Sequence, residues 1–320
     1  MKNYIITIDL GGTKILSALL NKNKEIIGMV KQPTDATKGA EYIVESIVKS
    51  INKIFDKYDV KEDEIKAISM GVPGTVNPQS GMLSNAPNLG IKNFNIKKSL
   101  QKNYDIPVLL ENDVNLAALG IKKYEFDDNV KNMLVVFVGT GIGGALIFNG
   151  KIYRGSNFFA GEIGHIKVNS KGYFATGKKG VAFELLASRT AIVRKITEKM
   201  KKGKSSNIME FVKGGKIKSN ALAKAVASGD ELVTKEIIKA FKIIGRVLGS
   251  VTTLLNIDTI VLGGGVVEAI GDFVVPIVKK SFGNTVLPEP GKNVKILATK
   301  LGDEAPLYGG ISLADEFIEE

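Results

Sequence analysis

The chain has 320 residues, which exceeds the size at which one hydrophobic core usually stops growing, so two domains are expected. Hydrophobic residues make up 44% and charged residues 24%, as in a soluble globular protein. No run approaches the ~18 apolar residues of a membrane span, Asp9 interrupts the N-terminal apolar run of a would-be signal peptide, and the absence of cysteine excludes disulfides and a Cys nucleophile. We therefore expect a cytoplasmic protein with no membrane partner.

The net charge of +11 raises the question of nucleic-acid binding. Nearly all of the positive charge is lysine, and the lysines are scattered among Glu and Asp. Nucleic-acid readers usually draw on the bidentate fork of arginine. Arginine occurs only at Arg154, Arg189, Arg194 and Arg246. The charge pattern therefore indicates a lysine-rich solvated surface, with no nucleic-acid partner, although it could steer an anionic substrate.

Two segments of the chain share one pattern of strands and turns. In the first, a strand ends at Asp9, a turn contains Gly11 and Gly12, and strands at 15–20 and 25–30 follow. In the second, a strand at 134–138 meets a Gly-rich turn at 139–144, followed by a strand at 145–148, an Asn149-Gly150 hairpin turn and a strand at 151–153. Each half thus begins with a predicted three-stranded antiparallel meander. The repetition suggests a duplicated α/β unit and two related domains that face each other.

Helices and buried strands follow each meander. Isoleucines at 43, 47, 51 and 54 recur at helical spacing and predict a helix over about 39–58. Further elements are predicted in chain order: strands at 67–72 and 108–110, a helix from 113 capped by Asn112 or Asp113, a helix over 183–200, two or more helices across 219–256 with a break at Gly229-Asp230, a strand at 259–262, and a last helix over 304–320. Gly309 and Gly310 inside the last helix predict close backbone packing against a sheet.

The turn Asp9-Leu10-Gly11-Gly12-Thr13-Lys14 has the chemistry of a phosphate site. Two glycines let a ligand approach the backbone, and successive N–H groups in such a turn can bind an anion. The spacing does not match the GxxxxGK[ST] loop, and an ordinary glycine turn in a hairpin is the alternative.

The second turn, with Gly139, Thr140 and Gly141, strengthens the phosphate interpretation. Two Gly-Thr turns at equivalent places in two related domains would make a clamp for a polyphosphate. Asp9 could then hold Mg²⁺, directly or through water, because that ion prefers carboxylate, water and phosphate oxygens.

The segment Glu111-Asn112-Asp113 stands between a strand and a helix. An aspartate there could accept the proton of a substrate hydroxyl while the hydroxyl attacks a γ-phosphate. The alternative is that Asp113 or Asn112 only caps the helix.

A third polar set is Glu162 and His165 in Gly-Glu-Ile-Gly-His, together with Glu184 on the following helix. Such residues can read sugar hydroxyls as donor–acceptor pairs, although a lone histidine is more often structural. The run Gly263-Gly264-Gly265 after a strand would let an adenosine lie against the backbone, but alone it is a weak signal.

Together these motifs resemble the ROK family of sugar kinases and repressors over essentially the whole chain. The resemblance implies an α/β fold of two ribonuclease-H-like domains, of the actin/hexokinase type, with an interdomain cleft. The last helix would return to the first domain, giving a smaller domain of residues 1–114 plus 303–320 and a larger one of residues 115–302. Family members are usually homodimers or homotetramers.

The resemblance also implies roles for individual residues. Asp113 would be the general base, ATP and Mg²⁺ the cofactors, and a hexose the substrate. The segment Asn85-Ala86-Pro87-Asn88-Leu89 is similar to one that lines the sugar. Sugar ligands would then be Asn88, Asn112, Glu162, His165 and Glu184. Nucleotide contacts would be Asp9, Gly11, Gly12, Thr13, Lys14, Gly139, Thr140, Gly141, Gly263, Gly264 and Gly265.

The sequence departs from the family in one loop. Members usually carry a zinc site made of the signature histidine and a Cys-rich loop, but the corresponding region 172–182 has no cysteine. A tetrahedral N/S site cannot be built from one histidine, so no zinc is expected. The loop should instead be held by packing around Tyr173, Phe174 or Val181, and another group should orient His165.

The lead hypothesis is transfer of the γ-phosphate of MgATP to the 6-hydroxyl of glucose. The same chemistry on fructose, mannose, allose or N-acetylmannosamine stays open. A non-catalytic sugar sensor that controls transcription through a partner is the alternative from another class. Repressors of the family carry an N-terminal helix-turn-helix domain, whereas this chain begins at the phosphate motif, so direct DNA binding is not expected.

Overall fold

The computed structural model describes residues 2–175, 177 and 180–318, which form two compact units. Unit 1 contains Met1–Asn129, Ile152–Ala160 and Asp303–Glu320, and unit 2 contains Val130–Lys151 and Gly161–Gly302. The C-terminal segment thus lies in unit 1. Residues 115–129 and 152–160 also lie in unit 1, where the sequence-based ranges had placed them in the second domain.

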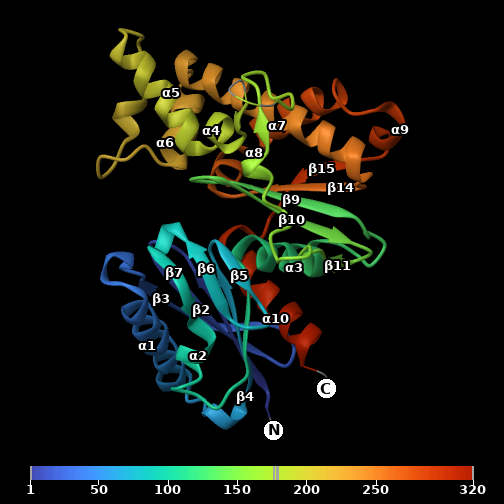
Figure 1. Ribbon diagram of the computed structural model, residues 1–320. Coiled ribbons are helices and arrows are strands. Elements are labelled where there is room, and N and C mark those ends of the chain that lie inside the picture. The colour runs from blue at the N-terminus through green and yellow to red at the C-terminus, as the bar shows by residue number, and fades with distance from the viewer. Residues whose placement is uncertain (1, 176, 178–179, 319–320) are drawn as a thin grey trace. The chain divides into compact units, whose positions relative to one another are not determined.

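The centre of unit 1 is a five-stranded sheet of order β3-β2-β1-β4-β8 (Figure 1). Its strands are β1 (Tyr4–Leu10), β2 (Lys14–Asn21), β3 (Ile26–Pro33), β4 (Ile65–Val72) and β8 (Val108–Asn112). The first three strands pair antiparallel, which confirms the predicted meander, whereas β4 and β8 run parallel to β1. Three fully buried side chains of β1, Ile6, Ile8 and Leu10, alternate toward the core that includes α1 (Ala40–Tyr58).

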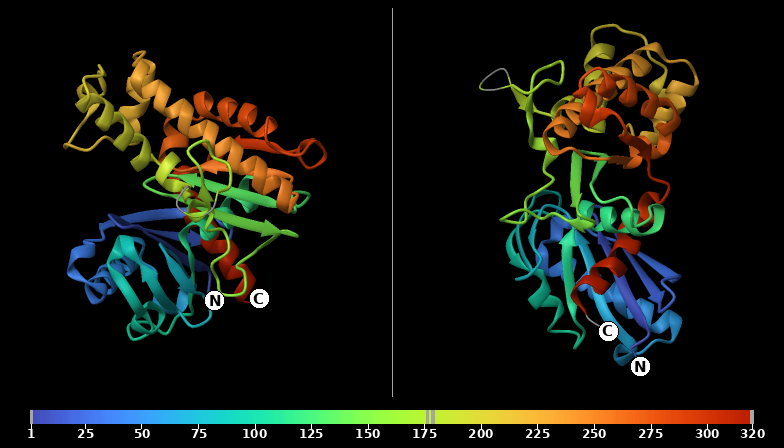
Figure 2. Two further views of the ribbon diagram at one scale, coloured as in Figure 1. Left: turned by 45° about the horizontal axis from the view of Figure 1, so that its top comes forward. Right: turned by 90° about the vertical axis from the view of Figure 1, so that its right-hand side faces the viewer.

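The helices of unit 1 cover the sheet. Helix α1 buries the isoleucines at 43, 47, 51 and 54, as their spacing predicts. The helices α3 (Asp113–Glu125) and α10 (Ala305–Phe317) pack side by side (Figures 1 and 2). A Cβ on Gly309 would lie 1.7 Å from the carbonyl oxygen of Leu116, and one on Gly310 would lie 2.4 Å from Thr7 on β1. This confirms the predicted close approach of the two glycines.

A second, three-stranded antiparallel sheet in unit 1 was not predicted from the sequence. It consists of β5 (Thr75–Asn77), β6 (Met82–Ala86) and β7 (Ile91–Asn95). The 3₁₀ turn Pro87–Leu89 connects β6 to β7 and carries Asn88, and α2 (Ile96–Leu100) follows β7.

Unit 2 repeats the sheet of unit 1. Its order is β11-β10-β9-β14-β15, with β11 (Lys151–Ile152), β10 (Ile142–Phe148), β9 (Met133–Val138), β14 (Thr259–Gly263) and β15 (Lys295–Ala298). Strand β10 runs antiparallel to β9, and β14 runs parallel to both β9 and β15. Asn149 and Gly150 have φ values of 52° and 77°, as a type I′ turn requires. The shared strand order supports the predicted duplication.

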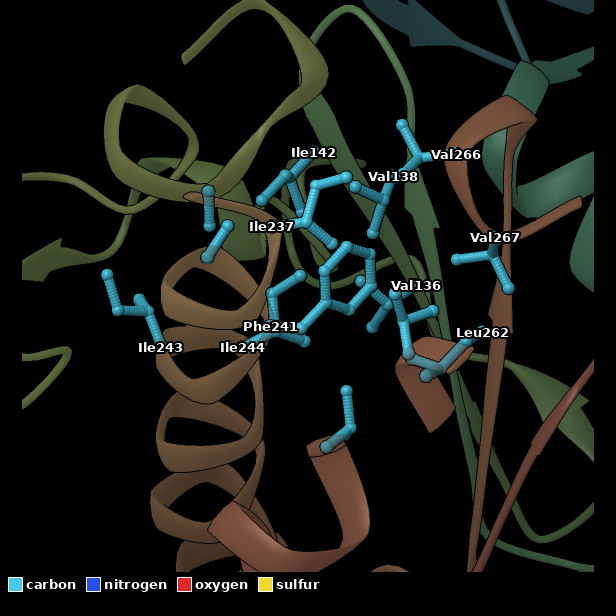
Figure 3. Packing of buried hydrophobic residues seen from close by; sticks show 14 of the residues in the cluster. Val136, Val138, Ile142, Ile237, Phe241, Ile243, Ile244, Leu262, Val266 and Val267 are labelled. Atoms are coloured by element: carbon cyan, nitrogen blue, oxygen red, sulfur yellow. The ribbon is translucent and has the colours of Figure 1, made fainter. Parts of the chain in front are cut away.

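The long helix α7 (Glu231–Leu255) packs on this sheet together with α8 (Gly265–Gly283). Figure 3 shows the ring of Phe241 among Val136, Ile244 and other apolar side chains from the sheet and both helices. The predicted break at Gly229-Asp230 is confirmed, since it separates α6 (Ser219–Ala227) from α7. Asp230 caps α7 by accepting a hydrogen bond from the N–H of Val233 at 2.9 Å. The short helix α9 (Pro288–Gly291) precedes β15. None of the helices in the described part of the chain is long and apolar enough to cross a membrane.

The predicted single helix over 183–200 is wrong. Two helices occupy this stretch, α4 (Glu184–Ala187) and α5 (Arg189–Lys201). Ser188 interrupts them because its backbone is extended, with φ −68° and ψ 164°, and its side chain accepts a hydrogen bond from the N–H of Ala191. The buried serine thus acts as an N-cap and starts a new helix.

Candidate functional site

The turn between β1 and β2 is held by hydrogen bonds to its own backbone. The N–H of Gly11 donates to the carbonyl oxygen of Lys14 at 2.9 Å, and the Thr34 hydroxyl donates to the Gly11 carbonyl at 2.6 Å. A Cβ on Gly12 would lie 3.0 Å from the carbonyl oxygen of Asn88, so the 3₁₀ turn of Asn88 lies against this loop. A hollow of about 540 Å³ is lined by Gly11, Gly12, Thr13, Lys14, Lys31, Gln32 and Pro33.

The two predicted acids, Asp9 and Asp113, meet at the carboxyl edge of the sheet. In the parallel register, Asp9 of β1 stands beside Gly71 of β4, and Gly71 stands beside Glu111 of β8. A Cβ on Gly71 would lie 3.4 Å from the Cα of Asp113. Glycine at this position therefore lets the start of α3 approach the end of β4.

The helix cap at the start of α3 is Asn112, one of the two predicted caps. Its side-chain oxygen accepts hydrogen bonds from the N–H groups of Val114 and Asn115, at 2.9 and 3.2 Å. Asp113 is the first helical residue, and its Oδ1 accepts a hydrogen bond from the N–H of Val114 at 2.9 Å. The main capping role therefore falls to Asn112, and Asp113 is not needed as the N-cap.

The environment of the Asp9 carboxyl disfavours its charged form. Burial, followed by the nearby charge of Asp113, raises its pKa from 3.8 to about 7. Lys14 lowers this pKa and Asp303 raises it. Asp303 also forms an ion pair with Lys14. Asp303 was not predicted from the sequence, because 289 residues separate it from Lys14 and no motif connects them.

Replacing Asp9 with asparagine is expected to stabilise the protein at high pH in the absence of nucleotide and metal. A carboxyl with a raised folded-state pKa contributes stability below its unfolded pKa, here 3.8, and that contribution is lost as pH rises through about 7. The gain from Asp9→Asn should thus be small near pH 4 and plateau above pH 7 at about 2–4 kcal/mol. Thermal unfolding of both proteins across this range measures the difference, and a gain independent of pH would contradict the assignment.

In unit 2, the second Gly-Thr turn is open on one side. The N–H of Gly139 donates to the carbonyl oxygen of Gly141 at 3.0 Å, and a Cβ on Gly139 would meet no atom within 4 Å. Arg189, the first residue of α5, donates from Nη2 to the hydroxyl of Thr140 at 2.9 Å. No role was predicted for Arg189, because no motif includes it, and the scarcity of arginine in the chain was the one available signal.

Of the sugar-ligand candidates in unit 2, Glu184 is hydrogen-bonded to the backbone, whereas the side chains of Glu162 and His165 are exposed. Glu184 lies against the second turn, where its Oε2 accepts a hydrogen bond from the N–H of Ile142 at 3.3 Å. A Cβ on Gly164 would lie 3.5 Å from the Cβ of Glu184, so the Gly-Glu-Ile-Gly-His segment passes beside Glu184. The side chains of Glu162 and His165 are 48% and 68% exposed, and 3.7 Å separates Glu162 Oε2 from His165 Nε2.

The glycine run from the end of β14 to the start of α8 is explained in part by close packing. Gly264 has φ 81°, and a Cβ there would lie 2.8 Å from the backbone nitrogen of Val138. A Cβ on Gly263 would lie 2.9 Å from the ring of Phe137. A Cβ on Gly265 would meet only the side chain of Ser219, at 3.2 Å. Close packing accounts for the first two glycines, so the assignment of this run to adenosine stays a prediction.

The loop without cysteines is not held by a buried apolar cluster. Tyr173, Phe174 and Val181, around which packing was expected, are 46%, 50% and 37% exposed. The loop is closed by pairing of β12 (Lys167–Val168) with β13 (Val181–Ala182) and by a bridge from Val168 to Phe174. Thr176, Lys178 and Lys179 of this loop lie outside the described residues.

Contacts with α7 support the same loop. A Cβ on Gly172 would lie 3.1 Å from Ile243, and the guanidinium of Arg246 lies 5.6 Å from the ring centre of Tyr173. In the part of the chain that the structure describes, no group of three or more His, Asp or Glu side chains is placed to hold a metal ion.

The described contacts gather the predicted residues into two sets. Unit 1 holds the first Gly turn, Asn88, Asn112 and the two aspartates. Unit 2 holds the second Gly turn, Glu184 and the Glu162–His165 pair. Each set combines a glycine-containing turn with polar side chains.

Comparison with known proteins identifies relatives over the whole chain. Residues 5–316 match the model of the ROK family. A glucokinase of Halalkalibacterium halodurans is 31% identical over 310 residues, covering 96% of this chain and 93% of that protein. A xylose repressor of Caldicellulosiruptor bescii is 25% identical over 309 residues, covering 97% of this chain and 77% of the repressor.

A solved structure agrees with this result. A ROK family glucokinase from Streptomyces griseus, in complex with glucose and AMPPNP, superposes with a TM-score of 0.82 at 26% identity. The match covers 98% of this chain and 99% of that one. It confirms an α/β fold of the actin/hexokinase type. The family match across nearly the full length and the relative at 31% identity show that the chain belongs to the ROK family.

Proposed function

We propose that this protein is an ATP-dependent hexose kinase that transfers the γ-phosphate to the 6-hydroxyl of glucose. The observation that carries the proposal is the meeting of Asp113 and Asp9 at the carboxyl edge of the unit 1 sheet, beside the first Gly-Thr turn. Similarity to a glucokinase at 31% identity supports glucose as the sugar.

Asp113 is the general base in this proposal. Its carboxylate accepts the proton of the 6-hydroxyl as the hydroxyl oxygen attacks the γ-phosphorus, and the bond to the β-phosphate oxygen breaks to release ADP. Its place in the first turn of α3 suits this role, because Asn112 already caps the helix and the Asp113 backbone is held in the helix.

The first Gly-Thr turn and the acids beside it suit a phosphate–metal pair. The N–H of Gly11 already donates to the carbonyl oxygen of Lys14, so other backbone N–H groups of this turn and the Lys14 ammonium would contact phosphate oxygens. Mg²⁺, held by Asp9 directly or through water, would neutralise phosphate charge. Asp9 fits this role as a single carboxylate ligand, with water and phosphate oxygens completing the coordination, because its buried carboxyl lies near the charges of Asp113 and Lys14.

The polar residues outside the phosphate loops are proposed to bind the sugar. Asn88 lies against the first turn, and Glu184 lies against the second. Asn112, Glu162 and His165 complete the proposed set. Carboxylates, amides and imidazole form hydrogen bonds with hydroxyl groups as acceptors and donors. A sugar that lacks one of these hydroxyls would leave a polar side chain without its partner and would therefore bind less well.

The direct test is release of ADP from MgATP in the presence of glucose, fructose, mannose, allose and N-acetylmannosamine. Turnover with glucose at the highest kcat/KM supports the proposal, and a different preferred hexose would keep the chemistry but change the substrate. If no hexose releases ADP while glucose still raises the melting temperature, the protein is a sugar sensor. The similarity to a xylose repressor makes that outcome the specific alternative.

Arg189 is expected to contact the phosphoryl donor, because its guanidinium stands at the open Gly139–Thr140 turn. Arg189→Gln should raise the KM for MgATP about tenfold, the effect of losing one charge-assisted hydrogen bond. The matched control is Arg194→Gln, five residues along α5, where the side chain pairs with Leu185 and Glu198. Equal effects of the two variants would assign the change to net charge alone.

A further inference from the structure

A buried carboxylate stands directly before the proposed base. Glu111 is 1% exposed. Its Oε1 accepts hydrogen bonds from the N–H of Asn112 at 2.9 Å and from Asn115 Nδ2 at 3.0 Å. Its Oε2 accepts a hydrogen bond from Nε of Arg154 at 2.6 Å. Both oxygens are therefore engaged, and the arginine supplies the positive charge that a buried carboxylate requires.

The partners of Glu111 set the first turn of α3. Asn112 caps the helix through its side-chain oxygen and donates from Nδ2 to the carbonyl oxygen of Gly74 at 3.1 Å. Asn115 lies one turn further along α3 and is buried. Asp113 stands between these two asparagines. The residues before and after Asp113 are thus held by hydrogen bonds that converge on Glu111.

Arg154 connects Glu111 to a distant part of the chain. It belongs to the segment Ile152–Ala160 of unit 1, and its side chain is 16% exposed. Its Nη1 and Nη2 donate to the two carboxylate oxygens of Glu316 on α10, at 2.9 and 3.0 Å. The guanidinium also lies 5.5 Å from the ring centre of Phe317. Such a bidentate pair holds the guanidinium plane in one orientation.

We propose that Arg154 is a positioning residue for Asp113, acting through Glu111, which deepens the proposed kinase function and rests on it. The arginine keeps Glu111 in place as a buried acceptor, and Glu111 holds the N–H of Asn112 and the amide of Asn115. Without Arg154, the buried carboxylate has no cation and turns toward water, because burial of an unpaired charge is unfavourable. The first turn of α3 then loses the contact that orients Asp113.

Steady-state kinetics of Arg154→Gln test this role. The kcat should fall about 100-fold, as expected when a base is misplaced by about 1 Å. The KM values for glucose and MgATP should change less than about threefold, because the lost interaction matters in the transition state. Arg154→Lys should lie between the two proteins, because lysine keeps the charge but not the fork. A kcat for Arg154→Gln equal to that of the unmodified protein would overturn the proposal.

A matched control separates positioning from loss of stability. Ile54→Ala removes a fully buried side chain of α1, far along the chain from β8, and should also lower the melting temperature. Its kcat should stay near that of the unmodified protein at temperatures where both are folded. If Ile54→Ala lowers kcat as much as Arg154→Gln, Arg154 has a structural role only.

A double variant tests the charge pairing. In Glu111→Gln the side-chain oxygen still accepts from the N–H of Asn112, but the buried charge is gone. Glu111→Gln with Arg154→Gln should therefore have a higher kcat than Arg154→Gln alone. No recovery would overturn the proposed route through Glu111.

Hydrogen exchange tests the same contact without relying on catalysis. The amides of Asn112, Val114 and Asn115 should exchange faster in Arg154→Gln than in Ile54→Ala. If the unmodified chain phosphorylates no hexose, the proposed function fails. Hydrogen exchange over residues 108–116 then remains as the test of whether Arg154 orders the start of α3. Unchanged exchange at these amides would refute the positioning role in either case.

Discussion

Replacing Asp113 with asparagine is expected to lower kcat for hexose phosphorylation by at least ~100-fold, the low end for removal of a general base. Asparagine keeps the size of the side chain and an oxygen that can accept from the N–H of Val114, so the start of α3 should persist. It cannot accept the proton of the sugar hydroxyl. Coupled measurement of ADP release, with calorimetry of glucose binding, should show lost turnover with binding largely kept.

The control for Asp113→Asn is Glu231→Gln. Glu231 is the first residue of α7, so this variant also removes a negative charge from a helix N-terminus, where such a charge is favourable. It should lose a little stability and no activity. Turnover of Asp113→Asn within tenfold of the unmodified protein would assign proton removal to another group, and the sensor hypothesis would gain if neither protein turned over.

Most of the architecture could be predicted from local patterns. A few neighbouring residues were enough to predict three features: the helix α1 from its isoleucines, the two Gly-Thr turns, and the Asn149-Gly150 hairpin. Because both halves of the sequence carry the same pattern of strands and turns, it could also be predicted that their two sheets share one strand order. Gly309 and Gly310 indicated a close helix contact, and the structure shows which backbone each one meets.

The features that were missed depend on distant or unusual contacts. Ser188 splits a helix because its extended backbone lets its side chain cap the next one, and a serine inside an apolar periodicity gives little warning of this. The small β5–β7 sheet consists of short strands with weak alternation. Asp303 and Arg154 act on residues far away in sequence, so no local spacing could identify their partners.

The site residues of unit 1 also show how function and stability oppose each other. The Asp9 carboxyl is buried and lies near the charge of Asp113, and these two causes together raise its pKa to about 7. A protein selected for stability alone would neutralise that edge of the sheet. In the proposed kinase a divalent cation and phosphate groups would bind there, and binding to the folded state would add stability by mass action. The expected stabilisation by Asp9→Asn and the proposed role of Asp9 in holding Mg²⁺ both follow from the burial of this one carboxyl.

Gly309→Ala is expected to be the most destabilising single-methyl change in unit 1. The added Cβ would stand 1.7 Å from the carbonyl oxygen of Leu116, and backbone atoms cannot turn away as a side chain can. The helices α3 and α10 would have to separate. Overpacking of this kind costs up to about 3 kcal/mol, and more where the backbone must move. Because α3 carries Asp113, kcat should fall along with the unfolding midpoint.

Gly283→Ala is the control, because it adds the same methyl group inside a helix without a clash. Gly283 lies at the end of α8, and a Cβ there would meet no atom within 4 Å. This variant should be neutral or up to about 1 kcal/mol more stable, since alanine restricts the unfolded chain and favours helix. Thermal unfolding of both variants separates the clash from the loss of glycine. Equal midpoints for the two would mean that α3 and α10 can part at little cost, and the close approach of these helices would then not be what places Asp113.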